Sequence, residues 1–273
     1  MTPVKYAKSV FDAIALPVNI ARVWLRARGS DAIVLHNGRF KSIPPGVLIP
    51  VFCRSKRGGL TKPPNLTILL VHNRPDKTLM EQSLEYLGIR DYTVLRLPSD
   101  QPWRHTARIA AILDHLRSGA CATEYILVSD SDDALIRDDP QKAIDLLRAA
   151  DCEMLVSSTA YAAYHGMPDV KIKTMSLAPP QRDGSRHPRI HLNAGVYIAR
   201  ASFLREYLEA TRQYVSEHDL AIEKLNIISD EDLLRLLPDF PRGVGSDQTI
   251  MRYLFPQFYP RMKIDYDERL ARR

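Results

Sequence analysis

Residues 125–133 read YILVSDSDD, an apolar run that ends in a cluster of aspartates. The run favours a short buried strand with Asp130, Asp132 and Asp133 at its carboxyl end, where ligands bind in open α/β sheets. Crowded carboxylates raise one another's pKa unless a cation lies between them. Oxygen ligands suit Mg²⁺ or Mn²⁺. The stretch therefore predicts a divalent-metal site for a nucleotide diphosphate; a solvated turn that caps the next helix is the alternative.

Apolar runs and helical patterns alternate from residue 66 onward. Strands are expected at residues 66–71, 92–97, 125–128, 154–157 and 192–199. Helices are expected at residues 76–87, with Gly88 as the stop, and at 103–116, 140–150, 201–214 and 247–255. This order predicts an α/β fold with a mostly parallel sheet that helices cover on both faces.

The N-terminal part of the chain differs in pattern from the rest. We expect residues 1–64 to form a basic extension or linker, followed by a single domain at residues 65–273. Residues 32–40 favour a strand, an Asn-Gly turn and a second strand. The Pro-Pro-Gly sequence at 44–46 then breaks the pattern, and the basic run at 54–59 reads as an exposed linker.

Residues 10–28 form an apolar segment with basic residues on either side. Such a segment could lie on an anionic membrane, or it could be a helix packed on the domain's own surface. No signal peptide is recognisable, and the apolar stretch is too short to span a bilayer. The expected location is the cytoplasm, with peripheral contact at the inner membrane face left open.

Composition is that of a soluble globular protein. The 273 residues are 45% hydrophobic and 26% charged, enough for a sizeable core. The formal charge of +6 makes anionic partners plausible without selecting one. Cys53, Cys121 and Cys152 show no CxxC spacing, so we expect reduced thiols.

Asn193, Ala194 and Gly195 precede the apolar run 196–198. An amide followed by small residues at the start of a strand lets a ligand approach the backbone closely. A plain turn is the other reading of this segment.

Two further polar pairs occupy positions where a ligand would lie. His72 and Asn73 end the first strand of the domain, where a base or ribose is expected. Asp247 and Gln248 follow a glycine-rich stretch at a helix start. Asp247 could serve chemistry or could simply cap that helix.

In this order the motifs resemble a metal-dependent nucleotide-sugar glycosyltransferase of the GT-A fold, which is Rossmann-like. More narrowly, residues 66–267 resemble the glycosyltransferase domains of the procollagen galactosyltransferase and lysyl hydroxylase group. The resemblance implies that Asp130 and Asp133 bind Mn²⁺ or Mg²⁺. That family usually supplies a metal-binding histidine beyond its last strand. This sequence shows no such segment, so the third ligand is unassigned.

The resemblance also implies transfer of a hexose from a UDP-sugar to a hydroxyl acceptor. Asp132 would orient the sugar or ribose, while Asn193, Ala194 and Gly195 would bind the sugar. Gln248 and Asp247 would sit near the anomeric carbon, with Asp247 as a base or an oxocarbenium stabiliser.

Arg104 and Arg74 are candidate contacts to the diphosphate of the donor; ordinary surface arginines are the alternative. The sequence leaves open whether the anomeric configuration is inverted or retained. It also leaves open the acceptor, which could itself be anionic: a lipid, a polysaccharide or DNA.

The second half of the sequence carries weaker signals. Residues 171–189 should form a loop near the ligand, and the acids at 229–232 read as a helix cap. Four other histidines match no helix or hairpin spacing for a metal, so we expect them in loops or on the surface: His105, His165, His187 and His191.

Two other function classes remain open. A nucleotidyltransferase or phosphatase would also use clustered aspartates with a divalent ion, although the sequence has no P-loop. A basic nucleic-acid-binding module would rest on the runs at 54–57 and 269–273. Interleaved aromatic residues are missing there, which favours solvated charge runs.

Overall fold

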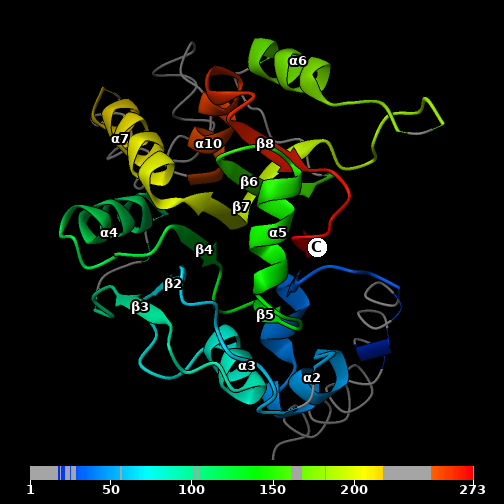
Figure 1. Ribbon diagram of the computed structural model, residues 1–273, viewed down its shortest axis with the longest axis vertical. Helices are drawn as coiled ribbons and strands as arrows, with labels where there is room; N and C mark the ends of the chain where they lie inside the picture. The colour runs from blue at the N-terminus through cyan, green and yellow to red at the C-terminus, as the bar shows by residue number, and fades with distance from the viewer. Residues whose placement is uncertain are drawn as a thin grey trace, which may run out of the picture.

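The computed structural model describes residues 29–55, 57–100, 103, 105–160, 168–181, 183–217 and 247–272, with positions 18, 20, 21 and 25 near the start (Figure 1). Predictions for Arg104, His165 and residues 229–232 lie outside this part of the chain, as does most of segment 10–28.

A mixed six-stranded sheet forms the centre of the molecule, in the order β3-β2-β4-β7-β6-β8. All neighbouring pairs are parallel except those made by β7, which runs antiparallel to both β4 and β6. The predicted α/β class with a mostly parallel sheet is therefore confirmed. The strands are β2 (Leu66–His72), β3 (Thr93–Arg96), β4 (Tyr125–Ser129), β6 (Met154–Thr159), β7 (His191–Arg200) and β8 (Met262–Asp265).

Helices cover both faces of this sheet because its strands are apolar on both sides. In β2, Leu69 and Val71 face one hydrophobic cluster, whereas Leu66, Ile68 and Leu70 face the other. The first cluster packs against α4 (His105–Arg117), α7 (Ala201–Glu217) and α10 (Asp247–Phe258). The second packs against α3 (Leu79–Leu87) and α5 (Gln141–Ala149).

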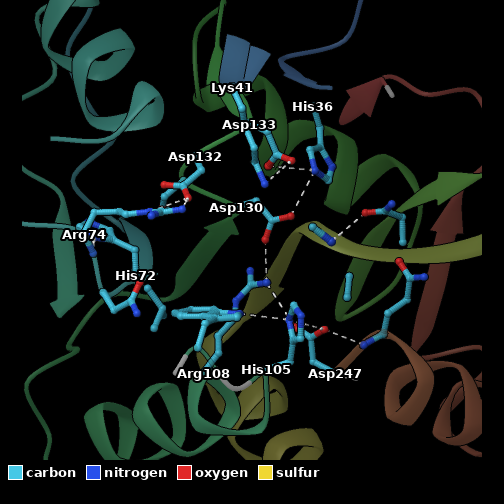
Figure 2. A pocket seen from close by; sticks show the side chains of 18 residues that line it. His36, Lys41, His72, Arg74, His105, Arg108, Asp130, Asp132, Asp133 and Asp247 are labelled. Carbon is cyan, nitrogen blue, oxygen red and sulfur yellow. Dashed lines mark hydrogen bonds and ion pairs between the residues drawn. The ribbon is translucent and has the colours of Figure 1, made fainter. Parts of the chain in front are cut away.

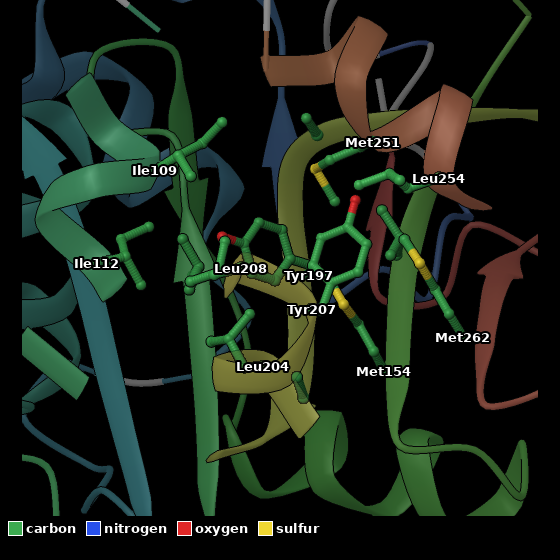
Figure 3. Close-up of a cluster of buried hydrophobic side chains, with 14 of the residues drawn as sticks. Ile109, Ile112, Met154, Tyr197, Leu204, Tyr207, Leu208, Met251, Leu254 and Met262 are labelled. Carbon is green, nitrogen blue, oxygen red and sulfur yellow. The ribbon is translucent and has the colours of Figure 1, made fainter. Parts of the chain in front are cut away.

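Figure 3 shows the first cluster, where side chains of α4 and α7 meet residues of β7 and α10. Ile109, Ile112, Leu113 and Leu116 of α4 are buried, as their spacing predicted. Leu79, Ser83 and Leu87 of α3 are buried in the same way on the other side of the sheet.

A second, three-stranded sheet has the order β5-β1-β9. It joins β1 (Val34–His36) to β5 (Ala134–Ile136) and to β9 (Ala271–Arg272). The pairing with β5 is antiparallel and the pairing with β9 is parallel. Residues 34–36, from the expected extension, are therefore hydrogen-bonded to the segment that directly follows the aspartates.

The structure differs from the predictions in the stretch around β1. The second strand expected before residue 40 is a 3₁₀ helix, η1 (Gly38–Ser42). The Pro-Pro-Gly sequence does not end regular structure but begins α2 (Pro45–Phe52), with Pro45 in its first turn. Proline fits that position because the first helical N–H groups have no partner inside the helix. Arg54 lies near Asp31 and Asp138, so the basic run does not begin as a free linker.

The loop expected at 171–189 is also partly helical. Helix α6 (Pro168–Leu177) occupies its first residues and packs against α10. The apolar residues of α6 do not gather on one face, and Ile172 is 66% exposed. The sequence therefore showed no apolar stripe that would have indicated a helix. The basic tail is not simply solvated, because Ala271–Arg272 forms β9. In the described part of the chain, no helix has the length and apolar character needed to cross a membrane.

The C-terminus of α3 provides a test of how closely this helix packs against the segment around Gly58. Gly88 has φ +100°, and a Cβ there would lie 3.0 Å from backbone atoms of Gly58. Gly119 also has a positive φ, +75°, but would meet no atom within 4 Å. We expect Gly119→Ala to cost about 1 kcal/mol through backbone strain, and Gly88→Ala about 2–3 kcal/mol. Urea unfolding of both variants measures the difference; equal losses would show that the contact with Gly58 does not matter.

Candidate functional site

A polar cleft of about 610 Å³ opens at the carboxyl ends of β2 and β4 (Figure 2). These two strands are parallel neighbours, so the residues that follow them meet at one edge of the sheet. The predicted site residues that the structure describes all line this cleft: His72, Asn73, Asp130, Asp132, Asp133, Asn193, Ala194, Gly195, Asp247 and Gln248.

His36 of β1 joins two of the aspartates at the centre of the cleft. Its Nε2 lies 3.2 Å from Asp130 Oδ2 and 3.4 Å from Asp133 Oδ1. The pairing of β1 with β5 sets this contact, because it places His36 opposite Ala134, the residue after Asp133. The Asn37 N–H donates to the carbonyl of Asp133 at 2.7 Å and fixes the same register.

Gly195 leaves the space that His36 occupies. A Cβ on Gly195 would lie 2.5 Å from His36 Cε1 and 2.7 Å from Asp130 Oδ2. The Gly195 carbonyl also accepts the N–H of Asp130 at 2.6 Å. Only a residue without a side chain allows both groups to pack against this part of β7.

The three side chains fit a divalent cation. Ligand atoms of His36, Asp130 and Asp133 all lie within 4.8 Å of one another. One imidazole and two carboxylates favour a transition ion such as Mn²⁺ over Mg²⁺, which prefers an all-oxygen shell. His36 thus offers the third ligand that sequence patterns left unassigned.

Positive groups balance the charge of Asp133. Burial alone would raise the pKa of Asp133, but the hydrogen bond and charge of His36 and the charge of Lys41 lower it to about 2. Lys41 Nζ lies 3.3 Å from Asp133 Oδ2. Asp133 is therefore a carboxylate at neutral pH and available to a cation.

Arg108 of α4 links Asp130 to Asp247. Its Nη1 lies 2.8 Å from Asp130 Oδ1 and 3.3 Å from Asp247 Oδ2. Burial would lower the pKa of Arg108, but the two carboxylates raise it, so the guanidinium stays charged. Burial raises the pKa of Asp247, against the opposing charges of Arg108 and His105. One buried cation therefore contacts both carboxylates.

Asp247 also bonds to its own helix. It is the first residue of α10, and its Oδ1 accepts the backbone N–H of Gln248 at 2.7 Å. The same oxygen lies 3.6 Å from His105 Nδ1. Asp247 thus bonds to the first turn of α10 and also lines the cleft.

Asp132 points away from the His36 cluster and pairs with Arg74. The Arg74 Nε and Nη2 lie 2.8 and 2.6 Å from Asp132 Oδ2. This pair is partly exposed at the cleft edge, where a ligand can reach both charges.

His72 is the last residue of β2 and contacts the buried Glu81. Its Nε2 lies 3.2 Å from Glu81 Oε2 of α3, and its Nδ1 accepts the Arg74 N–H at 3.2 Å. Burial lowers the pKa of His72, against the opposing charge of Glu81. His72 thereby fixes the backbone of the loop that carries Asn73 and Arg74.

Asn193 has a structural role that the sequence reading did not include. Its side-chain oxygen accepts the Gly195 N–H at 2.8 Å, and its carbonyl accepts the Ser157 hydroxyl at 3.0 Å. The register between β6 and β7 shifts near these residues. The segment therefore lies inside β7 at an irregularity, rather than at the start of the strand.

Sequence reasoning missed several residues of the cleft. Arg108 falls on the same helical stripe as Ile112 and Leu116, and a charge on an apolar stripe signals a buried partner. His36 and Lys41 gave no such signal, since only the sheet pairing brings them to Asp133. Trp103 and His105 also line the cleft, and the His105 side chain is 53% exposed, as expected of a surface histidine.

No protein-family model matches the chain, and no curated protein matches its sequence.

The close approach at Gly195 can be tested directly. Gly195→Ala should weaken Mn²⁺ binding by at least about tenfold, because the methyl group displaces His36 or Asp130. Gly38→Ala is a matched control, since a Cβ at Gly38 would meet nothing within 4 Å. Titration followed by the electron paramagnetic resonance of free Mn²⁺ gives both affinities. Equal affinity in Gly195→Ala and the unchanged protein would contradict the assignment.

Proposed function

We propose that the protein is a metal-dependent glycosyltransferase of the GT-A type, which moves a hexose from a UDP-sugar to a hydroxyl acceptor. The observation that carries the proposal is the convergence of His36, Asp130 and Asp133 at the carboxyl edge of a mostly parallel sheet. The adjoining cleft of about 610 Å³ is in the usual size range of small-molecule sites.

The cleft divides into groups suited to different parts of a nucleotide sugar. His36, Asp130 and Asp133 would hold Mn²⁺. A bound divalent ion would neutralise the diphosphate and stabilise the charge that builds on it as the glycosidic bond breaks. Lys41, beside Asp133, adds a further positive charge close to that position.

The nucleoside would lie beside β2, next to the Arg74–Asp132 pair. Asn73 follows the end of β2, and Asp132 offers a carboxylate to ribose or sugar hydroxyls. Arg74 can contact the diphosphate if it turns from Asp132, because its side chain is 58% exposed. Arg104 stays a candidate for the same role from the sequence alone.

The sugar would lie between β7 and the start of α10. Ala194 and Gly195 present little side chain there, so the ring can approach the backbone. Asp247 is the proposed base, and its raised pKa suits a group that accepts a proton from a hydroxyl. Arg108 would keep Asp247 in position through the contact described above, and Gln248 would bind a sugar hydroxyl.

Metal dependence is the first test. His36→Ala should weaken Mn²⁺ binding by at least about 100-fold and remove Mn²⁺-dependent release of UDP from UDP-sugars, since one of three ligands is lost. Asp130→Ala and Asp133→Ala should have the same effects, and excess EDTA should abolish UDP release by the unchanged protein. His115→Ala, a histidine of α4 outside the cleft, is the control. Full UDP release in EDTA would refute the metal role. Turnover of a sugar 1-phosphate with a nucleoside triphosphate would indicate a nucleotidyltransferase instead.

Asp247 provides the second test. Asp247→Asn keeps an oxygen for Arg108 but removes the base, so the rate of sugar transfer should fall by about 10²–10⁴-fold. UDP affinity, measured by calorimetry with Mn²⁺, should stay nearly unchanged. Asp114→Asn, an exposed aspartate of α4, controls for the loss of a charge. Equal losses of rate and UDP affinity would place Asp247 outside the reaction centre.

A further inference from the structure

A second pocket of about 250 Å³, here called the outer pocket, adjoins the cleft. Lys41, Arg74 and Asp132 line both cavities, so the two are neighbours. The outer pocket differs in character from the cleft, because four apolar side chains form much of its wall: Phe40, Ile43, Pro45 and Leu79.

The outer pocket carries an excess of positive charge. Three cations line it, Lys41, Arg74 and Lys77, against the single carboxylate of Asp132. Each has a partner in the protein: Asp133 at 3.3 Å for Lys41, Asp132 at 2.6 Å for Arg74 and Glu85 at 2.6 Å for Lys77. All three side chains are more than half exposed, at 56%, 58% and 55%, so they can turn toward an anion.

Helix α2, which begins at the outer pocket, has an exposed apolar face. Pro45 lines that pocket and begins α2, whose Val47 and Val51 lie one turn apart with 38% and 48% exposure. The opposite side of α2 is buried through Leu48, Ile49 and Phe52. A helix that buries one apolar face and exposes another indicates a contact surface.

Other exposed apolar residues lie in the same part of the sequence. Among the described residues, seven large apolar side chains are exposed, and four of them are Val18, Leu25, Val47 and Val51. Ile20 packs against the buried cluster that contains Leu48, Ile49 and Phe52 of α2. Apolar side chains next to cations are typical of surfaces that lie on anionic membranes.

We propose that the acceptor is a membrane amphiphile with an anionic head group, and that α2 docks on the membrane that contains it. The apolar face of α2 would enter the interface, the cations of the outer pocket would meet the anionic charge of the head groups, and the reacting hydroxyl would extend into the cleft toward Asp247. This inference rests on the proposed function for its transfer step. In that step a head-group hydroxyl bonds to the anomeric carbon as the bond to UDP breaks. The electron pair leaves with the diphosphate, and the hydroxyl proton passes to Asp247.

Vesicle sedimentation of the full chain tests the docking surface. Vesicles of phosphatidylcholine with phosphatidylglycerol should bind the protein more tightly than vesicles of phosphatidylcholine alone, and added salt should weaken the difference. Val47→Asp with Val51→Asp should weaken binding by at least about tenfold, because two apolar side chains leave the interface. Lys77→Gln should reduce the preference for the anionic vesicles by about fivefold.

The matched controls lie on α6, which Figure 1 shows at the opposite end of the molecule from α2. Ile172→Asp replaces an exposed apolar residue, and Lys173→Gln removes an exposed lysine. Neither should change vesicle binding. Unchanged thermal unfolding and unchanged calorimetric affinity for UDP with Mn²⁺ should show that every variant is folded.

Distinct outcomes separate this proposal from the proposed function. The membrane proposal is overturned if the protein binds neither kind of vesicle. It is also overturned if the variant with Val47→Asp and Val51→Asp binds vesicles as well as the unchanged protein, or if that variant changes only self-association. UDP and Mn²⁺ binding would survive each of these results, leaving the glycosyltransferase assignment intact. Vesicle binding without any UDP and Mn²⁺ binding would refute the assignment, and with it the role of α2 as an acceptor entrance.

Discussion

Electrostatic repulsion among Asp130, Asp132 and Asp133 is the constraint that the surrounding positive side chains of the cleft offset. Three carboxylates within four residues are stable only where positive charge meets each of them. Lys41 does this for Asp133, Arg74 for Asp132 and Arg108 for Asp130. These cations come from η1, the loop after β2 and α4, while His36 of β1 lies against Asp130 and Asp133. The charge cluster thus explains why elements distant in sequence converge on one edge of the sheet.

Much of the frame was predictable because local patterns determine it. The apolar runs of β2 and β4 and the buried stripes of α3 and α4 follow from hydrophobic periodicity. Placing Asp130 and Asn73 at one edge required only the rule that parallel strands end together. The roles of these residues in binding or catalysis are proposals, because they depend on a ligand rather than on the fold.

The misses have physical causes. His36 meets Asp130 through sheet pairings between segments far apart in sequence, which no local pattern encodes. Pro45 was read as a break, although proline in a first helical turn is favourable. Arg108 was the one recoverable case, since its helical position predicts burial and burial of a charge requires partners.

The position of β1 between β5 and β9 has a consequence for synthesis of the protein. His36 leaves the ribosome more than 200 residues before Ala271–Arg272, which complete one edge of its strand. Contacts between segments this distant form slowly, because a long loop must close first. The complete sheet around the His36 cluster therefore assembles only after residue 272 has been translated, and a nascent fragment that ends before it holds the aspartates without the complete sheet.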